Sequence, residues 1–285
     1  MGSEMCIRDS TYWASCEQSS GQALRRWTHS VRPVYRSGNP ALSDSTFDKS
    51  NYSDVPWWEE ESNLMSIEGV AEKTGILLLI TATTAIMTAF SMPEASSLIF
   101  IGALGGFVVA MIVIFSGSMN PMLICIYAAL EGLFLGGITW IFEVYLEMPG
   151  IGLLAALLTF LILGAMIAIY RAGLIAWDRN TQIAVTSAVV AILLIYLVSI
   201  IGSFFGFHVP YIHSAGPIGI GFSLFVVGIG ALCLVADFDF IEKGVERGAP
   251  KQLEWRAAFG LMVTLIWLYL EILKLLAKIA IASRR

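Results

Sequence analysis

The chain has 285 residues, of which 57% are hydrophobic and 14% are charged, and its mean hydropathy is +0.76. Soluble globular domains carry about 25% charged residues, so this composition excludes a soluble globular protein and indicates a membrane protein. The formal net charge of −5, with no clustered basic stripe, argues against a nucleic-acid partner.

The N-terminal region divides into two stretches. The first ten residues resemble translated adapter sequence (MGSEMCIRDS), and residues 1–35 have neither regular periodicity nor the apolar core of a signal peptide. We expect residues 1–35 to be a non-native or disordered leader. Residues 36–73 form a polar, acidic segment that ends in PWWEEESNLMSIEGVAEK, and we expect this segment to be cytosolic.

Seven apolar segments follow, each near the length of about 20 residues that a helix needs to cross the hydrocarbon core of a bilayer. Proline and glycine mark the short connections between them, as expected at helix ends. Because backbone polar groups must be satisfied inside a membrane, we predict an all-α, polytopic membrane protein in which residues 74–285 form a seven-transmembrane helix bundle. The predicted spans are 74–92, 96–116, 122–144, 151–170, 183–207, 218–240 and 257–280.

Two pairs of glycines have four-residue spacing: Gly102 with Gly106 in the second span, and Gly132 with Gly136 in the third. This spacing places both glycines of a pair on one helix face, where small residues let a neighbouring helix approach closely. Glycine is also frequent in membrane helices generally, so the alternative is that the spacing is incidental.

Lysine and arginine are distributed unevenly among the loops. They occur after the fourth and sixth spans, whereas the loops after the first, third and fifth spans have none. This bias predicts a cytosolic N-terminus. Seven crossings then place the basic segment KLLAKIAIASRR outside, so either the last segment does not cross fully or its charge is outweighed by the other loops.

Four acidic residues lie within apolar spans or at their edges: Glu131, Asp237, Asp239 and Glu271. Ionisable residues in a membrane usually face the bundle interior and mark ion or proton pathways. Each also has a structural alternative: Glu131 can be a neutral, hydrogen-bonded contact between helices. Asp239 can meet headgroup water, because it points away from Asp237. Glu271 can pair with Lys274, three residues further along the helix.

The acids lie at different depths. At 1.5 Å of rise per residue, Asp237, Glu131 and Glu271 lie roughly 6, 14 and 21 Å from the cytosolic boundary. Carboxylates that are close together in a low dielectric cannot all be ionised. Such a ladder attracts a cation when charged and not when protonated, which predicts a pH-gated cation path. Hard oxygen ligands of this kind favour calcium over softer metals.

The stretches LVADFDFIEKGVERG and WLYLEILKLL resemble the last two helices of the Bax inhibitor-1 family of membrane proteins. YAALEGLFLGG is similar to a recurrent stretch of that family, and SGNPALSDSTF resembles the leader of a bacterial branch. The resemblance extends from residue 36 to the end of the chain. It implies six helices wrapped around a central seventh, and a pH-dependent calcium leak sensed by acids on the last two helices.

By motif, the resemblance assigns the sensor pair to Asp237 and Glu271, which would also be transient ligands of a permeant calcium ion, with no resident cofactor. The longer link APKQLEWRAAF separates the two carboxyls by about 15 Å along straight helices. A kink or an interfacial segment at residues 249–258 would restore their contact. Otherwise we expect Asp237 to meet Arg171 or Arg256 near the cytosolic surface as a salt-bridged latch.

The alternative function is that of a regulatory membrane protein, which binds and restrains a membrane protease or another partner through the acidic stretch WWEEES and conducts no ions. An enzyme is not expected, because the sequence shows no nucleophile–base pair, phosphate loop or metal-ligand cluster. The expected location is the bacterial plasma membrane. The expected partners are lipid, calcium and a membrane protein.

Overall fold

The computed structural model describes residues 64–94, 96–145, 147–175, 177–205 and 214–284. Within these residues seven helices are long and apolar enough to cross a membrane, which confirms the all-α, polytopic architecture. The expected leader 1–35 and the stretch WWEEES lie outside the described residues. The helices are α2 (Ile67–Ser91), α3 (Ser97–Ser116), α4 (Pro121–Trp140) with a π-helical end η4 (Ile141–Tyr145), α5 (Ile151–Arg171), α6 (Arg179–Phe204), α7 (Pro217–Glu246) and α8 (Leu253–Ser283).

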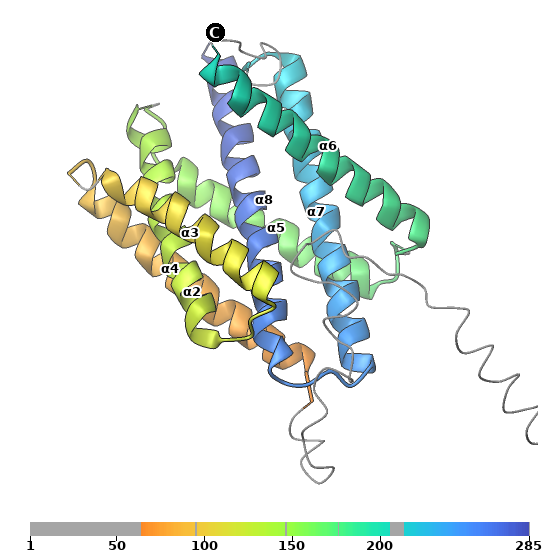
Figure 1. Ribbon diagram of the computed structural model, residues 1–285. Coiled ribbons are helices and arrows are strands. Elements are labelled where there is room, and N and C mark those ends of the chain that lie inside the picture. The colour runs from red at the N-terminus through yellow and green to blue at the C-terminus, as the bar shows by residue number, and fades with distance from the viewer. Residues whose placement is uncertain (1–63, 95, 146, 176, 206–213, 285) are drawn as a thin grey trace, which may run out of the picture. The chain divides into compact units, whose positions relative to one another are not determined.

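The last helix is the central one, as predicted. In α8, 61% of the most apolar stretch is buried inside the bundle, against 17% to 44% in the other six helices. It packs against α2, α4, α5 and α7. Figure 1 shows α8 with α2, α3 and α4 on one side of it and α6 and α7 on the other. Polar residues of α8 are therefore carried into the interior of the bundle.

The helices α2, α7 and α8 continue beyond the apolar spans predicted for them. α2 begins at Ile67, because the hydroxyl of Ser66 caps it by accepting a hydrogen bond of 3.0 Å from the Gly69 nitrogen. α7 continues to Glu246, and α8 already begins at Leu253. The residues expected to lengthen the link between α7 and α8 are therefore mostly the first turns of α8, which is one continuous helix.

The two glycine pairs permit close contacts between helices. A Cβ atom on Gly102 of α3 would lie 2.6 Å from the backbone nitrogen of Phe134 on α4. A Cβ atom on Gly136 of α4 would lie 2.8 Å from the Cα atom of Ala85 on α2. Real Cβ atoms do not approach backbone so closely. The glycine spacing is therefore a packing feature, as the first of the two interpretations predicts.

Gly136→Ala is expected to destabilise the bundle by about 1–3 kcal/mol, because the added methyl group forces the backbones of α2 and α4 apart. Gly164→Ala on α5 is the matched control, since nothing lies within 4 Å of the Cβ position there. Thermal unfolding in detergent, followed by circular dichroism, measures both variants. Equal melting temperatures would contradict the requirement for glycine at position 136.

Candidate functional site

The candidate site is built along α8, because this central helix carries four buried polar side chains, two of them acidic, and two lysines. They face α2, α3, α6 and α7 at successive levels. In chain order the buried residues are Glu254, Arg256, Thr264 and Glu271, and the partly buried lysines Lys274 and Lys278 follow. The first two lie at the end of α8 that adjoins the α7–α8 loop, and the last two lie toward its C-terminus.

Asp237 on α7 forms a hydrogen bond with α8. Its carboxyl group is buried, with 1% of the residue exposed, and it accepts a hydrogen bond of 2.6 Å from the hydroxyl of Thr264. The Thr264 hydroxyl also lies 3.4 Å from the carbonyl oxygen of Gly260 on its own helix. A buried acid is thus held at the interface of the two C-terminal helices.

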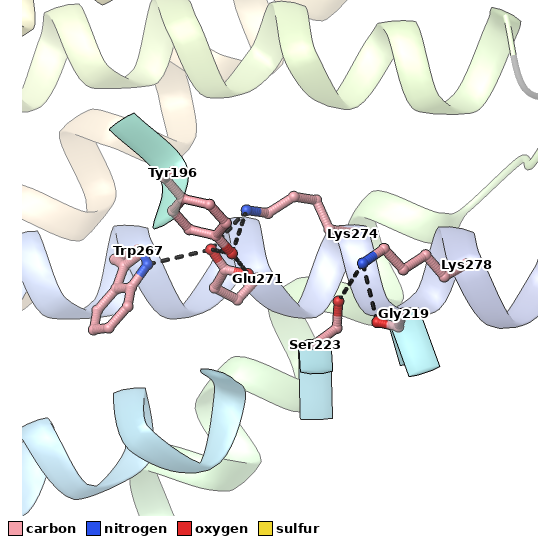
Figure 2. A network of polar contacts seen from close by, with 7 residues as sticks. All are labelled: Tyr196, Gly219, Ser223, Trp267, Glu271, Lys274 and Lys278. Atoms are coloured by element: carbon pink, nitrogen blue, oxygen red, sulfur yellow. Dashed lines mark hydrogen bonds and ion pairs between the residues drawn. The ribbon is translucent and has the colours of Figure 1, made fainter. Parts of the chain in front are cut away.

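Glu271 lies in a network between α6 and α8 (Figure 2). The Tyr196 hydroxyl donates to this carboxylate, at 3.0 Å from Oε1 and 2.9 Å from Oε2. The indole nitrogen of Trp267 lies 3.2 Å from Oε1, and Nζ of Lys274 lies 2.6 Å from the same atom. An ionised carboxylate offers only acceptors, so these donors match it. The pairing with Lys274 that the i, i+3 spacing allows is present.

Lys278 lies one helical turn beyond Lys274 and reaches the opposite neighbour. Its ammonium group donates to the carbonyl oxygen of Gly219 at 3.1 Å and to the hydroxyl of Ser223 at 2.8 Å, both on α7 (Figure 2). The two lysines of α8 are thus directed to different helices, Lys274 toward Tyr196 on α6 and Lys278 toward α7.

Asp237 and Glu271 are placed at different levels of the bundle. Thr264, which holds Asp237, precedes Glu271 by seven residues, or about 10 Å of helix rise. This axial separation is shorter than the distance of about 15 Å expected from two straight helices, but it is still too long for a contact between carboxyl groups. α8 is one uninterrupted helix through this region. A direct contact between the two carboxyls therefore requires α7 and α8 to slide relative to each other.

Glu131 lies between α3 and α4, away from this interface. Its side chain lies beside that of Tyr127, one turn earlier on α4. On the other side, a Cβ atom on Gly106 of α3 would be 3.0 Å from its Oε1 atom. The ring of Tyr127 packs edge-on against Phe259 of α8, with 4.8 Å between centroids. Glu131 is thus linked to the central helix through an aromatic pair.

The remaining predicted residues lie near the α7–α8 loop. Asp239 forms an ion pair of 2.6 Å with Lys243 on the next turn of α7. Arg171 is exposed at the end of α5. Arg256 is buried, and its guanidinium donates at 3.2 Å to the carbonyl oxygen of Gly117, which ends α3 in a left-handed conformation. A cation at the C-terminus of a helix stabilises its unpaired carbonyl groups.

The sequence reasoning missed Glu254, which is fully buried in the first turn of α8. It forms an ion pair with Lys73 of α2 and accepts from the backbone nitrogen of Ser66 at 2.9 Å. The adjoining Met65 nitrogen donates to the carbonyl oxygen of Ala249 at 2.7 Å. The start of α2 is therefore bound to the α7–α8 loop and to the first turn of α8 by these hydrogen bonds and this ion pair. A signal was available, because Glu254 precedes the buried Ala258 and Leu261 at helical spacing.

Among the described residues, no group of three or more histidine, cysteine, aspartate or glutamate side chains is arranged to hold a metal ion. In the comparison with models of protein families, the family described as Bax inhibitor 1 like matches residues 18–281. No curated protein and no solved structure matches the chain. The matched range contains α2 to α8 almost entirely, including the interface of α7 and α8.

Proposed function

Because this chain belongs to the Bax inhibitor 1 like family, we propose that it is a pH-sensitive leak channel for cations, calcium foremost. The observation that carries the proposal is the burial of two carboxyl groups, Asp237 and Glu271, at the contacts of the central helix of a multi-pass membrane protein. Burying an acid inside a membrane is costly, and such residues are retained mainly where they serve ions or protons.

The path that we propose follows α8. A cation entering at the α7–α8 loop meets Asp239 first and then Asp237, before it reaches Glu271 about 10 Å further along. Carboxylate oxygens suit calcium, and two single ligands bind the ion transiently rather than as a resident cofactor. We propose Asp237 as the pH sensor. Its ionised carboxylate attracts the cation, and its protonated carboxyl group does not. Arg171 and Arg256 are the candidates for a latch that closes the entrance.

We also propose the bacterial plasma membrane as the location and a cytosolic N-terminus. The support is the distribution of basic residues. Arg171 and Arg179 flank the loop after α5, and the loop after α7 contains Arg247 and Lys251, whereas the loops after α2, α4 and α6 carry no lysine or arginine. α8 is 31 residues long, about 46 Å, which suffices to cross the bilayer. Its C-terminus then lies outside, with Lys274 and Lys278 turned into contacts within the bundle.

A second candidate is the regulatory function, in which the protein binds a membrane protease or another partner through its N-terminal segment. Two hydrogen bonds favour it: the Met65 nitrogen donates to Ala249, and the Ser66 nitrogen donates to Glu254. These contacts connect the end of the acidic segment to the entrance of the proposed path. Binding of a partner there would act directly on the α7–α8 loop.

One experiment tests both candidates. Calcium entry into sealed liposomes is measured between pH 5 and pH 8 for the full chain and for a variant that lacks residues 37–63. The deletion stops before Leu64, because the following residues hold α8 in place. For a channel, both proteins conduct, and entry falls as the pH is lowered. Absence of entry with the full chain at every pH contradicts the leak and leaves the regulatory function.

A further inference from the structure

The carboxylate of Glu271 already has a cation beside it. Nζ of Lys274 lies 2.6 Å from Oε1, a distance typical of a charge-assisted hydrogen bond. The two partners differ in accessibility: 2% of the Glu271 side chain is exposed, against 39% of the Lys274 side chain. The ammonium group therefore covers the carboxylate on its accessible side. Any other cation that approaches Glu271 from that side meets the lysine first.

Tyr196 on α6 completes the position of this ammonium group. Nζ of Lys274 lies 4.6 Å from the centroid of the tyrosine ring and 3.4 Å from its hydroxyl oxygen. A cation over an aromatic face is stabilised by the ring quadrupole. The same hydroxyl donates to both oxygens of Glu271. Carboxylate, ring and hydroxyl together form a cation position, and the side chain of Lys274 fills it (Figure 2).

The neighbouring lysine does not take part in this position. Lys278, four residues further on, donates to Gly219 and Ser223 of α7 instead. Two ammonium groups on adjacent turns repel each other, and the contacts with α7 hold the second one away from Glu271. One carboxylate is thus matched by one lysine, and the two charges cancel where a single buried charge would be costly.

From this geometry we infer that Lys274 is a tethered counter-ion, which occupies the cation position at Glu271 and must leave before a permeant cation can bind there. The inference rests on the proposed leak and gives it a regulatory element. The long lysine side chain can swing aside without movement of α8, because much of it is already exposed. The resting protein is blocked at this level, and release of the ammonium group opens a divalent-cation position.

Terbium binding tests the inference without any measurement of flux. Terbium occupies calcium-type oxygen sites, and its emission is sensitised by a nearby indole; Trp267 lies against Glu271. We expect Lys274→Met to lower the terbium concentration at half-saturation by about tenfold or more. Lys278→Met is the matched control and should leave it unchanged. Lys274→Gln removes the charge but keeps a donor for Oε1, so it disturbs the packing less than Lys274→Met. It should lower the terbium concentration at half-saturation to a similar extent, which would show that the gain does not come from a folding defect.

Three outcomes overturn the inference: equal terbium binding by the wild type and both Lys274 variants, an equal gain in Lys278→Met, or a gain that persists when Glu271→Gln is combined with Lys274→Met. Melting temperatures in the same detergent confirm that the compared variants are folded. The leak is judged separately by calcium entry into liposomes. Tighter terbium binding by the Lys274 variants without any calcium entry would support the counter-ion and reject the leak. Calcium entry without tighter terbium binding would support the leak and reject the counter-ion.

Discussion

Glu254→Leu is expected to lower the free energy of unfolding by about 3–5 kcal/mol, the largest loss of stability among the substitutions considered. The reason is that Glu254 is fully buried and neutralises Lys73 while it accepts from the nitrogen and hydroxyl of Ser66. Without it, the partly buried ammonium group of Lys73 and one backbone donor lose their acceptor. Unfolding in mixed micelles, followed by circular dichroism, measures the change.

Two controls separate this ion pair from the general effect of adding leucine. Glu72→Leu alters an exposed acid one residue before Lys73 and should change stability by no more than about 0.5 kcal/mol. The double variant Lys73→Met, Glu254→Leu removes both charges and should recover most of the loss, as replacement of whole buried pairs does elsewhere. If the double variant is no more stable than Glu254→Leu, the pair is not the cause of the destabilisation.

Asp237→Asn is expected to remove most of the pH dependence of calcium entry. Asparagine resembles the protonated acid, so the variant should conduct at every pH as slowly as the wild type does at low pH. A single carboxyl titrates over about two pH units, so the wild-type rate should change mainly within such a window. The sign follows from charge: lowering the pH protonates Asp237, and the neutral form no longer attracts the cation.

The matched control is Asp239→Asn, two residues away on the same helix. Asp239 is paired with Lys243 and is partly exposed, so its charge is already balanced near the α7–α8 loop. Its substitution should leave the shape of the pH profile intact. If calcium entry by Asp237→Asn depends on pH as it does in the wild type, Asp237 is not the sensor. If Asp239→Asn loses the pH dependence of calcium entry, Asp239 is the sensor instead.

Hydropathy predicted the number and order of the helices, because a bilayer imposes both the length and the apolarity of a span. It placed the ends of α2, α7 and α8 several residues too far inward. Those ends are polar, and they remain helical through local contacts that hydropathy does not register, such as the Ser66 cap and the pairing of Asp239 with Lys243. Close packing at the glycine pairs was one of two interpretations of their spacing, because glycine is also frequent in membrane helices.

The contacts of the site could be predicted from the sequence only where both partners lie in the same helix. The i, i+3 spacing of Glu271 and Lys274 allowed their ion pair to be foreseen. Tyr196 was not foreseen, because α6 is apolar on all sides and its sequence does not show which face meets α8. The contacts of Glu254 with Lys73 and of Asp237 with Thr264 join different helices, and one sequence alone contains no signal for such pairs.

The most direct test of the route along α8 compares calcium entry into sealed liposomes for the wild type, the double variant Asp237→Asn, Glu271→Gln, and protein-free vesicles at pH 8. Our account predicts that the wild type admits calcium well above the protein-free rate, whereas the double variant, reconstituted at equal density and shown to be folded, admits little more than empty vesicles. Equal entry by the wild type and the double variant would contradict a path that passes these two carboxylates.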